Sequence, residues 1–209
     1  MKKIIIIILS ITFPVIYGQS VGYNKYPFTN VFENVYIDGG KHLLRVDVNF
    51  KGEFIVNEGT EILGEHSFDG CKNLTSIIIP DTVTNIMRSA FYACSSLTNV
   101  VFGSGLREIG ENAFLVCRNF GTINLPDSLE TIGERAFAGC IIKEIKIGKG
   151  LRNFDNNTFI YGDEIPGREK RDIKITISPS NQWLRVEGGK IVPKKQDEQI
   201  NENAEGVKK

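Results

Sequence analysis

Hydrophobic residues recur at a fixed interval along the middle of the chain. A phenylalanine and, three residues later, a cysteine return every 23 residues, at Phe68 and Cys71, Phe91 and Cys94, Phe114 and Cys117, and Phe137 and Cys140. Phe159 follows after 22 residues, one short of the interval. A fixed period of this length indicates a stack of similar structural units.

Each unit contains an apolar triplet whose members are spaced by three and then two residues. The triplets are Leu74, Ile77 and Ile79; Leu97, Val100 and Phe102; Phe120, Ile123 and Leu125; and Ile142, Ile145 and Ile147. The alternation at the end of each triplet is that of a short β-strand with one buried face. Because one strand per unit cannot bury that face alone, we expect the units to stack around a continuous core.

A turn follows each strand, and two kinds of turn alternate along the chain. They are Pro80-Asp81, Gly103-Ser104-Gly105, Pro126-Asp127 and Gly148-Lys149-Gly150. Proline with aspartate, and closely spaced glycines, both favour tight chain reversals. The alternation makes units one and three alike, and units two and four alike. It therefore indicates duplication of a two-unit block.

The repeat resembles a known family. The segment from Ile132 to Cys140, which reads Ile-Gly-Glu-Arg-Ala-Phe-Ala-Gly-Cys, resembles the BspA-type leucine-rich repeat, as do the triplets that end in Pro80 or Pro126. The resemblance covers about residues 52–179. With the strand pattern, it predicts an α/β solenoid with a stacked parallel sheet of about five short strands. The convex side is expected to be irregular or short-helical, with a β-hairpin cap at each end.

The N-terminal residues have the layout of a secretory signal peptide. Lys2 and Lys3 precede a long apolar run, and the small residues Gly18 and Ser20 follow it as expected cleavage points. We assign residues 1–18 to this signal. An anchor that stays in place is the alternative, although the run is short for a membrane span of about 20 residues.

Segments on either side of the repeats are expected to cover the ends of the stack, where core and strand edges would otherwise be exposed. In the N-terminal cap we expect a hairpin that turns at Lys51-Gly52, and in the C-terminal cap one that turns at Gly188-Gly189. A last strand with Ile173, Ile175 and Ile177 precedes the closing hairpin. The assigned ranges are 21–56 for the N-terminal cap, 57–179 for the repeats, 180–193 for the closing hairpin and 194–209 for a disordered tail.

The charge balance adds no sign of nucleic acid or acidic membrane as a partner. Lys and Arg number 25, as do Asp and Glu, so the formal net charge is zero, whereas such partners require a basic patch. Of the two histidines, His66 shares its repeat position with Ser89, Asn112 and Arg135, which suggests exposure. Since no base is aligned with a nucleophile, we predict no enzyme, no cofactor and no metal site.

The four cysteines occupy one column of the predicted stack. Neighbours in such a column lie about 4.8 Å apart with parallel side chains, whereas a disulfide needs Cβ atoms that face each other at about 3.5–4.5 Å. We therefore predict buried free thiols that act as small apolar residues, with disulfide pairing as the alternative. A zinc site is disfavoured, because a linear column does not form a tetrahedron.

The outward face of the strands is the candidate binding surface. Strand alternation places two columns there: Ser76, Asn99, Thr122 and Glu144, and beside them Ile78, Val101, Asn124 and Lys146. Ile78 and Val101 are apolar on a face that water should cover. A solvated sheet with two β-forming residues is the alternative to a recognition patch.

These features predict an exported protein, secreted or on the cell surface. Several members of the resembled family bind host matrix proteins, so the resemblance implies binding to an extracellular or surface protein, including adhesion to host or matrix proteins. A structural cell-envelope or assembly component without a specific host ligand is the alternative. No membrane span is expected after signal cleavage. The sequence leaves the ligand and the oligomeric state open.

Overall fold

The computed structural model describes residues 34–155, 157–159 and 173–194. The predicted signal peptide lies outside these residues, as do the N-terminal cap before residue 34 and the tail from residue 195.

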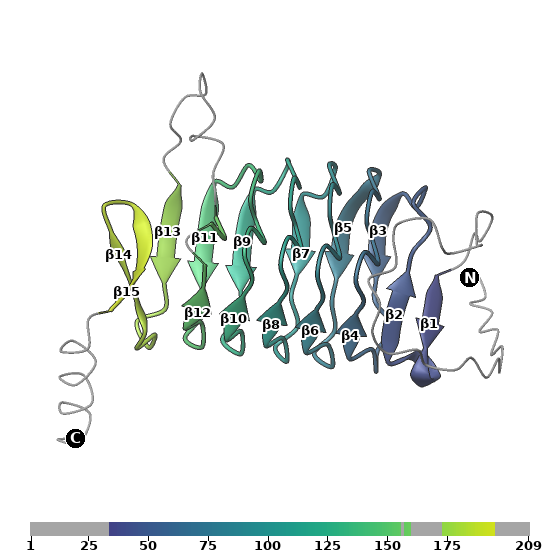
Figure 1. Ribbon diagram of the computed structural model, residues 1–209, viewed down its shortest axis with the longest axis horizontal. Helices are drawn as coiled ribbons and strands as arrows, with labels where there is room; N and C mark the ends of the chain where they lie inside the picture. The colour runs from purple at the N-terminus through teal and green to yellow at the C-terminus, as the bar shows by residue number, and fades with distance from the viewer. Residues whose placement is uncertain (1–33, 156, 160–172, 195–209) are drawn as a thin grey trace. The chain divides into compact units, whose positions relative to one another are not determined.

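Long and short strands alternate along the described chain (Figure 1). The long strands are β3 (Gly52–Ile55), β5 (Leu74–Ile78), β7 (Asn99–Val101), β9 (Thr122–Leu125), β11 (Glu144–Ile147) and β13 (Lys174–Ile177). The short strands are β4 (Ile62–Leu63), β6 (Asn85–Ile86), β8 (Glu108–Ile109), β10 (Thr131–Ile132) and β12 (Asn153–Phe154). One long strand, one short strand and the turns that join them are called a coil below.

The coils stack through parallel strand pairing. The five short strands join β1 (Val35–Ile37) and β2 (His42–Arg45) in a seven-stranded sheet. Its order is β1-β2-β4-β6-β8-β10-β12, and only the first pair is antiparallel. The long strands form two three-stranded parallel sheets, β3-β5-β7 and β9-β11-β13, where one sheet was expected. The break coincides with Phe120, a bulkier residue than Leu74 and Leu97 at the same repeat position.

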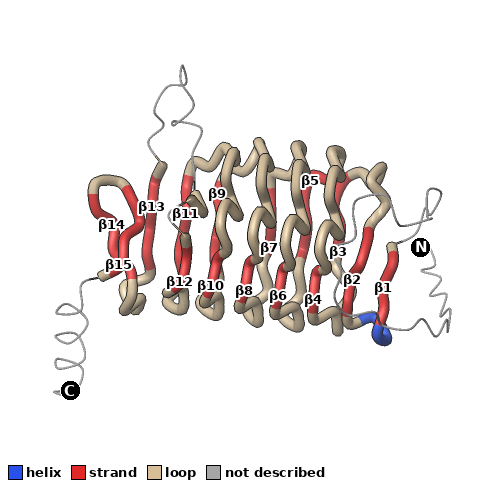
Figure 2. Tube along the Cα trace, in the orientation of Figure 1, coloured by secondary structure: helices blue, strands red, loops and turns tan. Residues whose placement is uncertain are grey.

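The expected α/β class is wrong, because the fold is a β-solenoid. The one helical element of the described residues is the 3-10 helix η1 (Asp38–Gly40), and loops and turns fill the rest of each coil (Figure 2). Left-handed backbone interrupts the turns after β4, β6, β8 and β10, and an α-helix cannot accommodate such residues. One left-handed column is His66, Ser89, Asn112 and Arg135 (φ 54–56°), and the other is Gly70, Ala93, Val116 and Gly139 (φ 56–73°).

The column of His66 was expected to be exposed, and this holds only in part. Arg135 is exposed, His66 and Asn112 are half-buried, and Ser89 is buried. The position lies on a left-handed turn, so the choice of residue there depends more on the backbone conformation than on exposure to solvent. Its variety in the sequence is therefore a poor guide to exposure.

A ladder of phenylalanine rings runs through the core. Consecutive rings of Phe68, Phe91, Phe114, Phe137 and Phe159 lie 4.6, 4.8, 5.1 and 5.5 Å apart between centroids. The three later pairs are nearly parallel, at 2–4°. The backbone holds the same register, since each N–H of Phe68, Phe91 and Phe114 donates to the alanine carbonyl of the next coil at 2.7 Å. The predicted 23-residue period thus corresponds to one step of this ladder.

The two kinds of turn fit together between coils. A Cβ atom added to Gly103 would overlap the carbonyl oxygen of Pro80, and one added to Gly148 would overlap that of Pro126. Each Gly-x-Gly turn therefore lies against the backbone of the Pro-Asp turn before it. The alternation seen in the sequence is a packing requirement as well as a trace of duplication.

The N-terminal hairpin lies earlier than expected. β1 (Val35–Ile37) and β2 (His42–Arg45) pair antiparallel around η1, whereas β3 pairs in parallel with β5, so no hairpin turns at Lys51-Gly52. Leu43 and Val46 are buried in the common core, and β2 pairs in parallel with β4. Residues from β2 onward therefore already follow the coil geometry, with a weaker version of the repeat pattern.

The C-terminal hairpin forms as the sequence predicts. β14 (Leu184–Glu187) pairs antiparallel with β15 (Lys190–Pro193), and Gly188 and Gly189 between them have positive φ. Asn181 joins this hairpin to the last coil. Its buried side-chain amide donates to the carbonyls of Gly148 and Leu151 at 2.9 and 3.1 Å.

Candidate functional site

The outward side chains of the long strands lie in two registered columns. In the first sheet Ser76 is paired with Asn99, and Ile78 with Val101. In the second sheet the pairs are Thr122 with Glu144, and Asn124 with Lys146. The structure thus places the eight predicted site residues on outward strand positions, four in each sheet and in register within that sheet. The columns extend to Glu53 and Ile55 at one end and to Lys174 and Thr176 at the other.

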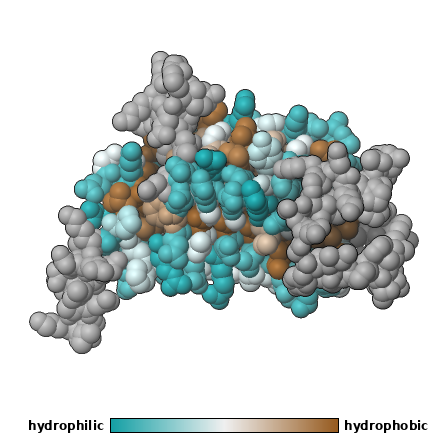
Figure 3. All heavy atoms as spheres, in the orientation of Figure 1, coloured by the Kyte–Doolittle hydropathy of each residue, from teal (hydrophilic) through white to brown (hydrophobic). Residues whose placement is uncertain are grey.

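Apolar side chains gather in the first sheet. Ile55 is 63% exposed and Val101 is 47% exposed, and the half-buried Ile78 lies between them in the same column. The equivalent positions of the second sheet hold Asn124 and Lys146. We call Ile55, Ile78 and Val101 the apolar row. Across the view in Figure 3, apolar side chains reach the surface between polar ones.

Polar and charged groups follow the other column. The Ser76 hydroxyl donates to the Glu53 carboxylate at 2.9 Å beside the apolar row. In the second sheet the Lys174 ammonium lies 2.9 Å from the Glu144 carboxylate. That hydrogen bond and the charge of Lys174 lower the pKa of Glu144. The face therefore has an apolar half with an acidic edge and a half in which lysines are prominent.

The four cysteines are buried and free, as predicted. They are also hydrogen-bonded, which the prediction of purely apolar thiols did not include. The Sγ atoms of Cys94, Cys117 and Cys140 lie 3.0–3.1 Å from the carbonyl oxygens of Phe68, Phe91 and Phe114. Burial raises the pKa of Cys71 to about 12 and also raises the pKa of Cys117 and Cys140. Neutral thiols of this kind are poor nucleophiles and poor metal ligands.

The histidines pair with local carboxylates. Nδ1 of His66 lies 3.0 Å from Asp69, and Nδ1 of His42 lies 2.9 Å from Asp38. Within the described ranges, no three His, Cys, Asp or Glu side chains come together in a way that could hold a metal ion. The part of the chain that the structure describes also contains no helix with the length and hydropathy of a membrane span.

The repeats match a family model. The model is that of the BspA type leucine rich repeat region, and six copies of it match residues 49–165. No curated protein matches the chain.

Several solved structures resemble the chain. A leucine-rich repeat protein from Eubacterium ventriosum is 22% identical with a TM-score of 0.61, over 73% of this chain and 41% of its own. The pneumococcal vaccine antigen PcpA is 16% identical with a TM-score of 0.56, over 72% and 45%. A leucine-rich repeat protein from Bacteroides ovatus is 26% identical with a TM-score of 0.50, over 63% and 38%. The chain spans less than half the length of each, and the likeness shows a shared fold.

Proposed function

Because this chain belongs to the BspA-type leucine-rich repeat family, we propose that it is an exported protein that binds an extracellular protein through the outward face of its long strands. The observation that carries the proposal is the apolar row of Ile55, Ile78 and Val101. The role is one of binding, without catalysis. The signal-like pattern of residues 1–18 supports export to the cell surface or the medium.

The apolar row suits a protein contact. Large fractions of the Ile55 and Val101 side chains are exposed, whereas the apolar residues on the opposite face of the same strands are buried in the core. Exposed apolar groups bordered by polar ones are typical of protein-binding patches, which have an apolar centre and a polar rim. Glu53 and Ser76 supply such a border on one side, held by their own hydrogen bond.

The charge along the face indicates the chemistry of the partner. The partner would place an apolar anchor over β3, β5 and β7, where the face is apolar. Over β11 it would place carboxylates, because Lys146 is exposed there beside Asn124. Charged groups of this kind chiefly set orientation and association rate, while the buried apolar contact supplies most of the affinity.

Binding of the chain from residue 19 to a panel of matrix and serum proteins tests the proposal. The diagnostic variant is Ile78→Glu/Val101→Glu, which puts two charges in the apolar row without touching the core. The matched control is Val186→Glu, since Val186 is a similarly exposed valine (44%) on β14 of the closing hairpin. Circular dichroism would confirm that both variants fold.

Saturable binding that disappears in the double variant and persists in Val186→Glu is the expected result. Binding that survives in the double variant would place the contact elsewhere and overturn the assigned face. Absence of binding to every panel member would favour a structural role in the cell envelope instead.

A further inference from the structure

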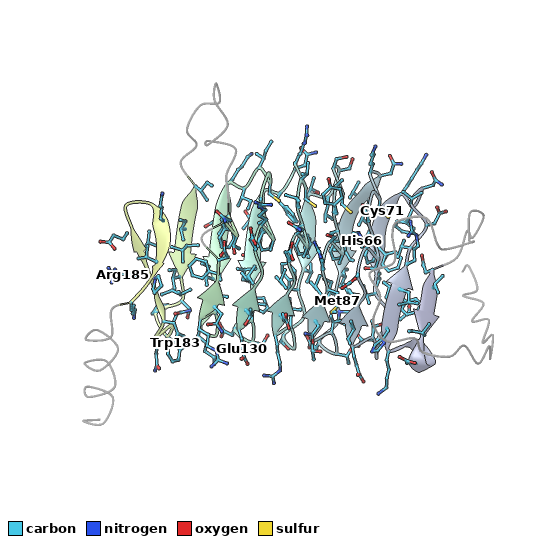
Figure 4. All side chains as sticks on the ribbon, in the orientation of Figure 1. His66, Cys71, Met87, Glu130, Trp183 and Arg185 are labelled. Carbon is cyan, nitrogen blue, oxygen red and sulfur yellow. The ribbon has the colours of Figure 1, made fainter. Side chains whose placement is uncertain are left out.

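A second surface, near the closing hairpin, carries an inference that is independent of the outward face. A shallow pocket there is lined by Arg107, Asp127, Ser128, Glu130, Gly150, Arg152 and Trp183. Its residues come from three successive coils and from the segment before β14. Figure 4 shows Glu130 and Trp183 along the same edge of the stack.

Glu130 is shared by two arginines. Nη1 of Arg107 lies 3.0 Å from one carboxylate oxygen of Glu130, and Nη2 of Arg152 pairs with the other. Both oxygens of this carboxylate are therefore engaged. Since each guanidinium has five N–H donors and uses one nitrogen in the pair, most donors of both arginines remain available.

Two other polar groups of the pocket are partly engaged, and each keeps some acceptor capacity. Oδ1 of Asp127 accepts the backbone N–H of Lys149 at 3.0 Å, and the Ser128 hydroxyl donates to the carbonyl of Leu106 at 2.7 Å. The pocket thus has spare donors in excess of spare acceptors. This imbalance favours a ligand that carries acceptors, above all an anion, because guanidinium groups bind carboxylates with matched geometry.

Trp183 adds a flat apolar surface to these donors. It is the one tryptophan of the chain, and 38% of its surface is exposed. An indole of this exposure can cover the apolar face of a flat ligand. A sugar ring has such a face, lined by C–H groups, whereas the side chains of an acidic peptide are flexible and have none.

We propose that the pocket binds acidic polysaccharide, with a uronate carboxylate on Arg107 and Arg152 and its sugar ring on Trp183. The proposal concerns a different surface and a different ligand class from the protein-binding face. Failure of either one leaves the other standing.

Trp183 fluorescence gives a direct readout, because every change in tryptophan emission comes from this pocket. The probe is a hexamer of galacturonate, titrated into the chain from residue 19 at low and at high salt. Its fully methyl-esterified form keeps the sugar rings and removes the charge. A hexaglutamate peptide keeps the charge and removes the rings. Calorimetry supplies an independent affinity.

Arg107→Gln is the diagnostic variant, and Arg88→Gln is the matched control. Arg88 makes an equivalent exposed ion pair with Glu111 at 3.3 Å but does not line the pocket. Trp183→Ala, followed by calorimetry, tests the sugar platform. Thermal unfolding would verify that each variant keeps the fold.

Saturable binding of the hexagalacturonate is expected, with an affinity that drops by about tenfold or more in Arg107→Gln and stays unchanged in Arg88→Gln. Trp183→Ala and the methyl ester should each bind more weakly as well. Equal binding of hexaglutamate would overturn the sugar assignment in favour of a peptide. Equal losses in both arginine variants, or no fluorescence change and no heat, would overturn the site.

Discussion

The carboxylate of Asp81 accepts a hydrogen bond of 2.6 Å from the backbone N–H of Ser104, one coil further along the chain. Asp127 accepts the equivalent bond from Lys149 at 3.0 Å. Each Pro-Asp turn therefore holds the Gly-x-Gly turn beside it through a side chain as well as through packing.

Replacement of Asp81 by alanine should lower the free energy of unfolding by about 1 kcal/mol, the usual contribution of one such hydrogen bond. Asp81→Asn keeps an oxygen acceptor and should lose less. Urea denaturation of the purified chain would measure both values. Equal losses in the two variants would show that the negative charge, rather than the acceptor, holds the turn.

Gly103→Ala should destabilise the fold by about 2 kcal/mol or more, because the new methyl group overlaps the Pro80 carbonyl and forces the backbone to move. Gly121 is the matched control, since a Cβ atom there meets nothing within 4 Å and its φ is not positive. Gly121→Ala should leave stability unchanged or raise it slightly. Thermal unfolding of the pair tests the contact, and a tolerated Gly103→Ala would contradict it.

Ala93→Gly should stabilise the protein by about 0.5 kcal/mol. Ala93 has φ 56°, and relief of the left-handed strain, about 1–2 kcal/mol, exceeds the entropy that glycine adds to the unfolded chain. Ala138 does not share the positive φ, so Ala138→Gly should destabilise. Parallel urea denaturation of the two variants measures both effects. A loss of stability in both variants would argue against strain at Ala93.

The phenylalanine ladder should be most sensitive at its centre. Phe114 is fully buried and stacks on Phe91 and Phe137, so Phe114→Ala should cost about 3–5 kcal/mol. Phe159 stacks on Phe137 at the end of the described ladder and is 9% exposed. Phe159→Ala should therefore cost less. The midpoints of urea unfolding, compared for both variants, give the ranking, and the reverse order would count against a stacked core.

Alkaline pH should destabilise the protein through its buried thiols. An unfolded cysteine ionises near pH 8.5, and burial raises the pKa of Cys117 in the folded protein. The folded state thus favours the neutral thiol, so this contribution is complete below about pH 8.5. It is lost as pH rises from there toward the folded-state pKa.

Removal of one thiol isolates its share of that pH dependence. Above about pH 9, Cys117→Ala should make the decline of the unfolding free energy with pH less steep, by up to about 1.4 kcal/mol per pH unit. Urea unfolding would be measured for the parent and the variant at several alkaline pH values. The difference between the two unfolding free energies removes the contribution of lysine and tyrosine ionisation, which both proteins share. Identical slopes would refute the shift.

Periodic features were predictable from the sequence because a stack repeats them in space. Family membership, expected from residues such as Ile132 to Cys140, is confirmed by the match over residues 49–165. The pairs Ser76 with Asn99 and Ile78 with Val101 follow from strand alternation alone. Whether these residues bind a partner remains a prediction, since alternation gives direction and not affinity.

Backbone conformation was the main feature that the sequence concealed. Ala93 and Val116 look compatible with a short helix, yet both have positive φ. The available signal was the presence of Gly70 and Gly139 in the same column. The sequence also did not predict the pocket at Trp183. Arg107 and Trp183 both line this pocket, although Trp183 lies far along the chain and beyond the last regular repeat.

The fit of one turn onto another also governs how such an array can change in length. Each Gly-x-Gly turn packs against the Pro-Asp turn of the coil before it. Deletion of a single coil would therefore place two turns of the same kind next to each other. Only the gain or loss of two coils together restores the pairing. We therefore expect that both evolution and protein engineering would lengthen or shorten this stack by two coils at a time.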